Sequence, residues 1–449
     1  MTTSPPPALH GKRLLILGGN PETGSLVRAA NALGVVTVVA DPNPHAPAKR
    51  EAHERHEVDC LDVSAVVRLA RGARVDGVLV GVADLLVRPY QQLCERLGLP
   101  SYATPVTAEA FGTKAGFRDA CARYGIPGIP GYPLDHTLRA SDVDALRFPV
   151  MLKPVDGSAG VGMTVCRSVE ELPAAVRSVR SHSRSGAFLT ERYMTCADSF
   201  AYYTFHDGEV YLSAMADRHT TRRQGDVSPV CIGATYPSRH LDTFVRDVHP
   251  GLLAMFRGLG VRNGVLMVQF FVDEGAFYAY DPGFRLQGEA PHVVLDVING
   301  FNHQAMLVSL ALTGTMGVPD LAHRNDPALR GKCACTVWVL LRAGTIGAVR
   351  GLDAIRAWPG VVFVLQRFAE GDRVPEAAVG TERQVFARIY LVAQDGAQLR
   401  ALVAQVHATL GIEDAEGDDM IVDRLPPDVL SLTGTHHPLG SPPVTTPDA

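Results

Sequence analysis

The stretch 148–163 constrains the fold of this chain more than any other part of the sequence. An apolar run leads to Lys153 and then enters a turn that contains Gly157, Gly160 and Gly162. Because glycine has no Cβ, backbone N–H groups in such a turn can approach phosphate oxygens, while the lysine supplies positive charge. The pattern predicts a strand–loop–strand flap that can close over a phosphorylated ligand. A glycine-rich hairpin that binds nothing would have the same pattern.

Two common phosphate-binding motifs are excluded at this turn. No Gly-Lys-Ser/Thr follows the glycines, so the turn is not a Walker A loop. No helical pattern opens there either, as the dinucleotide fingerprint requires. A phosphate-binding loop at this position must therefore belong to another type.

Length and charge indicate an ordinary enzyme. The chain has 449 residues, 46% hydrophobic and 20% charged, which suits two to four domains. Its net charge is −5 and its basic residues are scattered, so we expect no nucleic-acid partner. The sequence has no signal-peptide pattern and no apolar run of about 18 residues, so we expect no membrane association and a cytoplasmic location.

The N-terminal part has the pattern of a doubly wound domain. Residues 13–20 read as a buried parallel strand, 23–33 as a helix and 35–40 as a second strand, and the unit 76–96 extends the pattern. Gly18 and Gly19 lie at a strand end, where a nucleotide could bind, but the full glycine fingerprint is missing. We therefore favour a structural role for these two glycines.

A second group of candidate functional residues lies on a predicted hairpin. Gln269 and Asp281 flank an Asp-Glu-Gly turn at 273–275, so antiparallel pairing places them at about the same level. Both oxygens could then reach one metal ion, and Arg285 follows where a cation could meet phosphate. A polar hairpin with an Asp–Arg pair is the alternative.

The order of these residues along the chain resembles the ATP-grasp superfamily, especially its carbamoyl-phosphate-synthase-like and carboxylate–amine ligase members. The resemblance rests on Lys114, Lys153, the 157–162 turn, Glu191, Asp198, Gln269, Asp281 and Arg285. It implies an α/β chain (an α+β grasp fold) with a Rossmann-like pre-ATP-grasp domain at 1–108. A two-lobed ATP-grasp domain would follow at 109–310, with its flap lobe at about 140–195. A β-rich C-terminal domain at 311–425 and a flexible tail at 426–449 would complete the chain.

The resemblance also implies a role for each residue. Lys114 and Lys153 would contact the phosphates of ATP, Asp198 the ribose hydroxyls, and Gln269 and Asp281 would hold Mg²⁺, with Mn²⁺ as an alternative. Arg285, with Lys153, would stabilise the transferring phosphoryl group. The remaining nucleotide contacts would come from the flap loop, from Glu191 at the adenine amino group and from two main-chain contacts: Gly157, Ser158, Ala159, Gly160, Val161, Gly162, Glu191, Tyr193 and Met194.

The sequence departs from the family at its usual Glu-x-Asn-x-Arg element, which here reads Asp281-Pro-Gly283-Phe-Arg285. The shorter carboxylate is tolerable, but Gly283 removes a ligand, which water or a main-chain carbonyl would have to replace. Just beyond, Glu289 and His292 either assist the metal or substrate or belong to a solvated loop.

A basic segment lies elsewhere in the chain. Arg218, His219, Arg222 and Arg223 either bind a carboxylate or phosphate or form a solvated basic loop.

The function implied by the resemblance is an ATP-dependent carboxylate–amine ligase that forms an amide or peptide bond through an acyl phosphate. Its partners would be small-molecule carboxylate and amine substrates; the oligomeric state stays open between a monomer and the homodimer that is common in similar proteins. Three alternatives remain: a bicarbonate-activating carboxylase or carbamoyl-phosphate-type enzyme, a non-catalytic ATP-binding regulatory module, and a dehydrogenase that uses the N-terminal domain.

Overall fold

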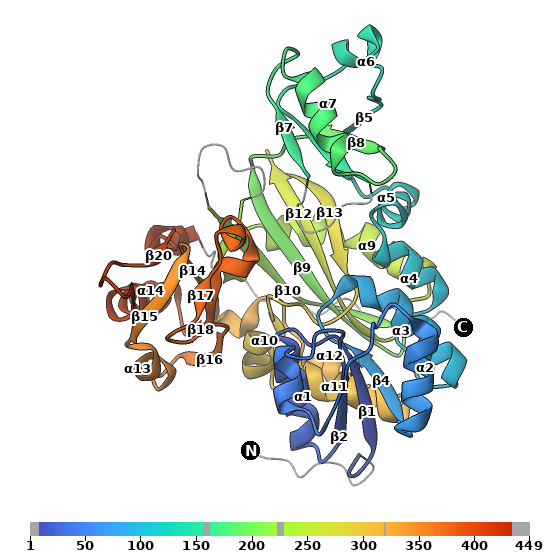
Figure 1. The fold of residues 1–449 in the computed structure, drawn as a ribbon, viewed down its shortest axis with the longest axis vertical. Helices are drawn as coiled ribbons and strands as arrows, with labels where there is room; N and C mark the ends of the chain where they lie inside the picture. Colours follow the sequence, from blue (N-terminus) through green and yellow to red (C-terminus); the bar gives the residue numbers. More distant parts are fainter. Residues whose placement is uncertain (1–8, 156–161, 222–228, 318–319, 433–449) are drawn as a thin grey trace, which may run out of the picture.

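The computed structural model describes residues 9–155, 162–221, 229–317 and 320–432. Helices and strands alternate in some parts of the chain and are grouped separately in others. The structure therefore has the expected mixed α/β class. Figure 1 shows a flap lobe projecting at the top, the N-terminal strands and helices at the bottom, and the C-terminal part at the left.

The N-terminal sheet is fully parallel, as the sequence predicts. Its strand order is β3-β2-β1-β4, and the apolar strand β1 lies between β2 and β4. The strands are β1 Arg13–Leu17, β2 Val36–Ala40, β3 Glu54–His56 and β4 Gly77–Val80, and the helices are α1 Thr23–Ala32, α2 Val63–Gly72 and α3 Val87–Leu97, with 3-10 turns η1 Pro47–Glu51 and η2 Asp84–Leu86. The Gly19 N–H donates to Asp41 Oδ2 at 2.7 Å, and a Cβ at Gly19 would lie 2.5 Å from that of Ala46. This glycine therefore closes a tight turn, in line with the structural role expected for it.

The flap lobe has its own small core. Its sheet has the order β5-β8-β6-β7, and the antiparallel pair β6–β7 confirms the two strands of the predicted flap. The elements are β5 Gly131–Tyr132, α6 Ala140–Asp144, β6 Val150–Pro154, β7 Thr164–Cys166, α7 Leu172–Ser181 and β8 Phe188–Arg192. Val150, Leu152, Cys166 and Val179 pack together inside this lobe. A lobe with a separate core can move as a unit against the rest of the chain.

Two helices connect the N-terminal sheet to the flap lobe. They are α4 Pro105–Gly112 and α5 Lys114–Arg123. The Thr113 side chain caps α5 by accepting from Gly116 N at 3.0 Å. The cap sets where α5 begins and places Lys114 in its first turn.

The central sheet extends into the C-terminal part of the molecule. Among the described residues it has nine strands, in the order β13-β12-β9-β10-β11-β14-β18-β16, with β20 paired to β14. These strands are β9 Ala197–His206, β10 Glu209–Thr220, β11 Cys231–Tyr236, β12 Gly264–Asp273, β13 Ala276–Gly283, β14 Cys333–Leu341, β16 Val361–Gln366, β18 Val385–Ala393 and β20 Ile421–Val422. The predicted 202–205 and 210–215 hairpin is present as β9–β10. Because β14 pairs with β11, the C-terminal strands β14, β18 and β16 continue the sheet formed by β9–β13.

Helices and a small second sheet cover the central sheet. They are α8 Leu241–Asp247, α9 His249–Gly258, α10 His292–Asn299, α11 His303–Thr313, α12 Leu321–Arg324, α13 Leu352–Arg356, α14 Gly396–Thr409, β15 Gly344–Arg350, β17 Arg373–Val374 and β19 Gly411–Asp414, with 3-10 turns η3 Leu329–Gly331, η4 Glu376–Ala378, η5 Glu382–Gln384 and η6 Pro427–Leu432. Helix α11 packs on β4 so closely that Gly77 has no room for a Cβ beside the Ala311 carbonyl. The N-terminal sheet is thereby fixed against the segment that follows β13.

The expected C-terminal tail lies partly outside the described residues. Residues 433–449 are not described, whereas η6 packs on α14 and buries Leu430. Within the described ranges, no helix is both long enough and apolar enough to cross a membrane.

Candidate active site

The Gln269–Asp281 pair is where the sequence predicts it. The two residues are direct partners in the antiparallel register of β12 and β13, and a bulge follows Gln269. Gln269 is buried and Asp281 partly buried, and neither side chain makes a hydrogen bond within the described residues. Two uncompensated oxygens on neighbouring strands fit a hard cation such as Mg²⁺, which often takes only one or two protein ligands alongside substrate phosphates.

Burial and a neighbouring charge change the acidity of Asp281. Desolvation raises its pKa from 3.8 to about 6, and the Asp84 carboxylate adds to this shift. Lys114 and Arg285 oppose the shift by favouring the charged form. The carboxylate is therefore held in an environment short of positive charge, which a divalent cation would relieve. No group of three or more His, Cys, Asp and Glu side chains forms a metal centre in the described ranges, so a cation here would depend on Gln269 and Asp281.

Arg285 is held rigidly next to this pair. Its guanidinium forms an ion pair with Asp84, and its Nη1 donates to Gln287 Oε1 at 2.6 Å and to the Leu286 carbonyl at 2.9 Å. The side chain is buried, and its Nε has no partner among the described residues. A buried cation with a free N–H group can bind an additional oxyanion.

Packing against Gln287 explains why position 283 is a glycine. A Cβ there would lie 2.7 Å from Gln287 Nε2, which donates to the Gly283 carbonyl at 2.5 Å. The missing carboxamide therefore makes room for Gln287, which in turn positions Arg285. Sequence reasoning identified the departure but not this compensation, because nothing in the sequence indicates that Gln287 folds back over position 283.

The two lysines predicted to bind phosphate lie on different elements, α5 and β6. Lys114 is exposed in the first turn of α5. Lys153 lies on β6, and its Nζ is 2.5 Å from Glu191 Oε2 on the neighbouring strand β8. Arg118 on α5 approaches the same carboxylate at 4.0 Å. Glu191 therefore neutralises Lys153 in this structure.

The remaining predicted nucleotide residues divide into two groups. Tyr193 and Met194 directly follow β8, at the connection between the flap lobe and the central sheet, and Gly162 has a left-handed φ of +76°. The predicted loop residues Gly157, Ser158, Ala159, Gly160 and Val161 lie outside the described residues.

Asp198 belongs to a buried charge network. Its Oδ2 accepts from Arg218 Nη1 at 2.6 Å and its Oδ1 from the Tyr280 hydroxyl at 3.0 Å. Arg218 Nη2 also pairs with Glu289 Oε1 at 3.0 Å. Burial raises the pKa of both Asp198 and Glu289, while Arg218 opposes the shift. Both Asp198 oxygens are already hydrogen-bonded in this structure.

For two segments the structure favours the alternative to a solvated loop at the residues it describes. Arg218 lies in strand β10 with only 11% of its side chain exposed, whereas Arg222 and Arg223 lie outside the described residues. Glu289 and His292 are both buried, at 8% and 4% exposure. The sequence around them is polar, but the C-terminal strands cover this segment and remove it from water.

Sequence reasoning missed three residues that complete the site. Asp84 holds Arg285, and Glu22 accepts from Arg388 Nη1 at 2.8 Å. Arg388 also donates to the Gly288 carbonyl at 2.6 Å and stacks 4.1 Å from the Trp338 ring. Its side chain is 1% exposed, so its charge depends on these partners. These contacts join the N-terminal sheet, the 285–290 loop and strand β18, and no local sequence signal indicates them.

Comparison with known proteins supports the nucleotide-binding part of this description. A family model described as carbamoyl-phosphate synthase L chain, ATP binding domain, matches residues 113–316. A formate-dependent phosphoribosylglycinamide formyltransferase from Bacillus velezensis is 29% identical over 165 residues, 36% of this chain and 43% of that protein. A phosphoribosylamine–glycine ligase from Lactococcus lactis is 23% identical over 370 residues, 78% of this chain and 84% of that protein. The chain spans less than half the length of the formyltransferases it matches.

Solved structures show the same fold over most of the chain. A phosphoribosylglycinamide synthetase from Anaerococcus prevotii superposes with a TM-score of 0.70 at 16% identity, covering 90% of this chain and 100% of that one. An L-amino acid ligase from Bacillus licheniformis gives 0.71 at 16% identity, covering 90% and 99%. A biotin carboxylase domain from Hydrogenobacter thermophilus, solved with MgADP and bicarbonate, gives 0.70 at 17% identity, covering 89% and 91%. The family match therefore identifies residues 113–316 as similar to the ATP-binding domain of ATP-grasp enzymes, and the solved structures show that the fold is shared over about 90% of the chain.

Proposed function

We propose that this protein is an ATP-dependent carboxylate–amine ligase that joins small, amino-acid-like substrates. The observation that carries the proposal is the Gln269–Asp281 pair, whose side chains make no hydrogen bond to any described residue, with the buried cation Arg285 beside it. The matched ATP-binding domain and the phosphoribosylamine–glycine ligase relative support the same activity.

The reaction requires two displacements. A substrate carboxylate oxygen attacks the γ-phosphorus of ATP, and the bond to the bridging oxygen breaks, which gives an acyl phosphate and ADP. An amine then attacks the acyl carbon, loses a proton, and displaces inorganic phosphate to form the amide. Because the phosphoryl group is transferred directly, no covalent enzyme intermediate is needed.

Residues of this chain supply charge and position at each step. Lys114 and Lys153 bind the ATP phosphates once Lys153 exchanges Glu191 for a phosphate oxygen. Arg285 faces the transferring phosphoryl group and the acyl phosphate, since Asp84 and Gln287 keep its guanidinium from rotating away. Mg²⁺ held by Gln269 and Asp281 would neutralise charge on the β- and γ-phosphates. Glu191 and the main chain at Tyr193 and Met194 would meet adenine, where the flap lobe connects to the central sheet.

The test is phosphate release from ATP and Mg²⁺ across amino acids, offered singly and in pairs. Hydroxylamine is added in a parallel series to trap the acyl phosphate as a hydroxamate. Release that depends on a carboxylic acid, yields a hydroxamate and is lost in Asp281→Ala would support the ligase. Release driven by bicarbonate would instead support a carboxylase, and ATP binding without turnover on any acid would support a regulatory module.

A further inference from the structure

An exposed groove lies between the start of helix α1 and the edge strand β16. Its volume is about 350 Å³. Residues from the segments 21–28 and 47–51 form one wall, and residues 363–366 of β16 with Arg356 of α13 form the other. None of the described residues that line the groove belongs to the predicted ATP site. The groove is therefore a feature separate from the Gln269–Asp281 pair.

The groove is basic although the protein as a whole is acidic. Arg28, Arg50 and Arg356 line it, and Glu51 is the one acid among its described lining residues. Positive charge therefore exceeds negative charge there, whereas the whole chain has a net charge of −5. The planar guanidinium group can donate two parallel hydrogen bonds to the oxygens of one phosphate or carboxylate group.

Two of the three arginines are available to a ligand. The Arg50 side chain has no ion pair or hydrogen bond within the described ranges. Arg28 Nη1 lies 3.0 Å from Glu51 Oε1, but both side chains are exposed, so this ion pair contributes little and can be exchanged. Arg356 is held more firmly, because it donates to Gln366 Oε1 at 2.7 Å and to the Val364 carbonyl at 3.2 Å.

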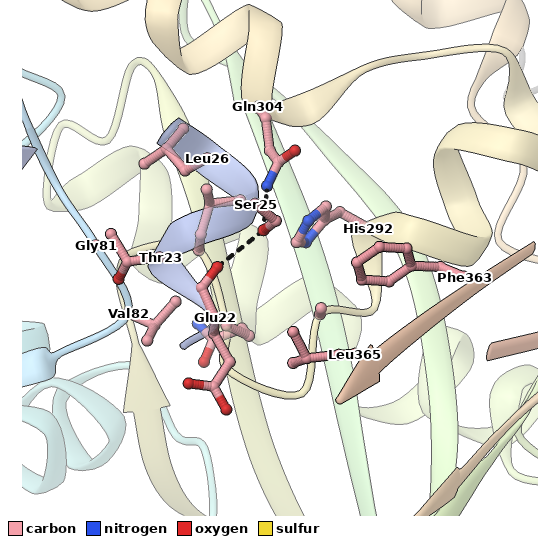
Figure 2. Close-up of a pocket in the computed structure, with 13 residues that line it drawn as sticks. Glu22, Thr23, Ser25, Leu26, Gly81, Val82, His292, Gln304, Phe363 and Leu365 are labelled. Atoms are coloured by element: carbon pink, nitrogen blue, oxygen red, sulfur yellow. Dashed lines mark hydrogen bonds between the residues drawn. The ribbon is translucent and has the colours of Figure 1, made fainter. Parts of the chain in front are cut away.

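Apolar side chains form the inner part of the groove. Phe363 and Leu365 line it, and Pro21 and Pro47 line the facing wall. Figure 2 shows the inner side of this junction, where Phe363 and Leu365 also line a small internal cavity of about 10 Å³ next to Glu22. A ligand that fits the groove would therefore place an anionic group among the arginines and an apolar group against β16.

We propose that this groove binds a small organic phosphate, with its phosphate group at Arg28 and Arg50 and its apolar part against Phe363 and Leu365. A phosphate monoester carries a charge of about −1.5 to −2 at pH 7, which matches the excess positive charge of the groove better than a single carboxylate does. The site does not depend on the proposed ligase activity.

Two other occupants fit the structure less well. A peptide strand paired to the edge of β16 would need free main-chain groups there, but Arg356 covers the Val364 carbonyl. A second copy of the chain, placed by a twofold axis through the groove, would bring a second set of the same arginines against the first. Like charges oppose that arrangement, whereas a small anion relieves the repulsion.

A ligand in the groove would also restrain the loop next to Arg285. Pro21 in one wall precedes Glu22, and Leu365 in the other wall is the register partner of Arg388 on β18. Glu22 Oε1 accepts from Arg388 Nη1 at 2.8 Å, and Arg388 Nη1 also donates to the Gly288 carbonyl at 2.6 Å. A molecule that contacts both walls therefore holds together the two segments that meet at this buried ion pair.

The first experiment measures binding of phenyl phosphate to the full chain by calorimetry at pH 7.5. We expect phenyl phosphate to bind about tenfold or more tightly than benzoate or succinate, because benzoate has one charge and succinate has no ring. Equal affinity for either carboxylate would overturn the assignment to a phosphate. An absence of binding up to about 10 mM would overturn the site altogether.

Variants locate the bound phosphate. Arg50→Gln should weaken phenyl phosphate about tenfold, as expected for loss of a hydrogen bond between charged groups. Arg71→Gln, at an exposed position on α2, is the matched control and should leave the affinity unchanged. Lys114→Gln reports binding at the ATP site instead. If Lys114→Gln weakens phenyl phosphate and Arg50→Gln does not, the groove site is refuted.

A further variant tests the apolar part of the groove. Phe363→Ala should weaken phenyl phosphate and leave the affinity for inorganic phosphate within about twofold. Equal weakening of both anions would contradict the seat for an apolar group. Sedimentation of Arg50→Gln should give the same mass as the wild type, and a changed mass would identify the groove as an interface between copies and overturn the ligand site.

Hydrogen exchange tests the link to the Arg285 loop. With phenyl phosphate bound, the Gly288 amide should exchange about twofold or more slowly in the wild type and at an unchanged rate in Arg50→Gln. An unchanged rate in wild-type protein saturated with phenyl phosphate would overturn this link.

Discussion

Replacing Asp281 with asparagine should stabilise the protein while removing a ligand of the proposed metal site. The carboxylate is partly buried and accepts no hydrogen bond from the part of the chain that the structure describes, and burial together with Asp84 raises its pKa from 3.8 to about 6. At roughly 1.4 kcal/mol per pKa unit this corresponds to about 3 kcal/mol of lost stability when the group is ionised, and partial exposure reduces the figure to about 2 kcal/mol.

The sign of the pH dependence follows from the raised pKa. Between pH 3.8 and about 6 the folded protein binds more protons at Asp281 than the unfolded chain does. Its contribution therefore falls as the pH rises through this window and stays low above it. Asparagine cannot ionise, so the Asp281→Asn variant should be about 2 kcal/mol more stable than the wild type at pH 8 and equal to it near pH 4.

Urea denaturation at pH 4, 6 and 8, without nucleotide, measures this difference directly. Asp119→Asn, at an exposed position on α5, is the matched control and should change stability little at any pH. Thermal unfolding with and without MgATP tests the binding part of the prediction. Bound MgATP should stabilise the wild type and not Asp281→Asn. A variant less stable than the wild type at pH 8 would refute the view that Asp281 is an uncompensated charge waiting for a cation.

Three further predictions concern burial, charge pairing and capping. His292→Phe should remove an acid-sensitive contribution: since burial lowers the His292 pKa to about 4, the wild type loses stability as the pH falls from 6.5, and urea midpoints of the variant should decline less between pH 7 and pH 5. Arg388→Leu should cost about 3–5 kcal/mol because it leaves Glu22 buried without its main partner, and a double-mutant cycle with Glu22→Leu should show a cost well below the sum. Thr113→Ala should cost about 1 kcal/mol through loss of the cap on Gly116 N, measured by thermal unfolding, and a loss below about 0.3 kcal/mol would contradict the cap assignment.

Much of the local structure could be predicted from the sequence. Continuous apolar runs separated by glycine and helical patterns indicate parallel strands, and β1, α1, β2 and β4 lie where these patterns place them. The pairing of Gln269 with Asp281 was also predictable, since a short turn sets the register of an antiparallel pair. In each case the interacting residues are close in sequence.

Burial of the segment after Arg285 could not be predicted in this way. Glu289 and His292 lie in a polar stretch that reads as a solvated loop, but they are buried beside strands that come from much later in the chain. Arg218 is similar, because Asp198 and Glu289 compensate its charge inside the protein. A polar sequence does not reveal whether residues far away in the chain will compensate its charges and accept or donate its hydrogen bonds.

By itself, the sequence determined the strands, the flap element and the order of the ATP-site residues, because these depend on periodicity and on turns within short stretches. Only the tertiary structure decided how Arg285 is held and which charges surround the cavity. The Asp84–Arg285 contact joins residues 201 positions apart, and Glu22–Arg388 joins residues 366 apart. Such pairs form only where the N-terminal sheet, the central sheet and the C-terminal strands pack together, since burial makes each charge dependent on a partner that local sequence cannot specify.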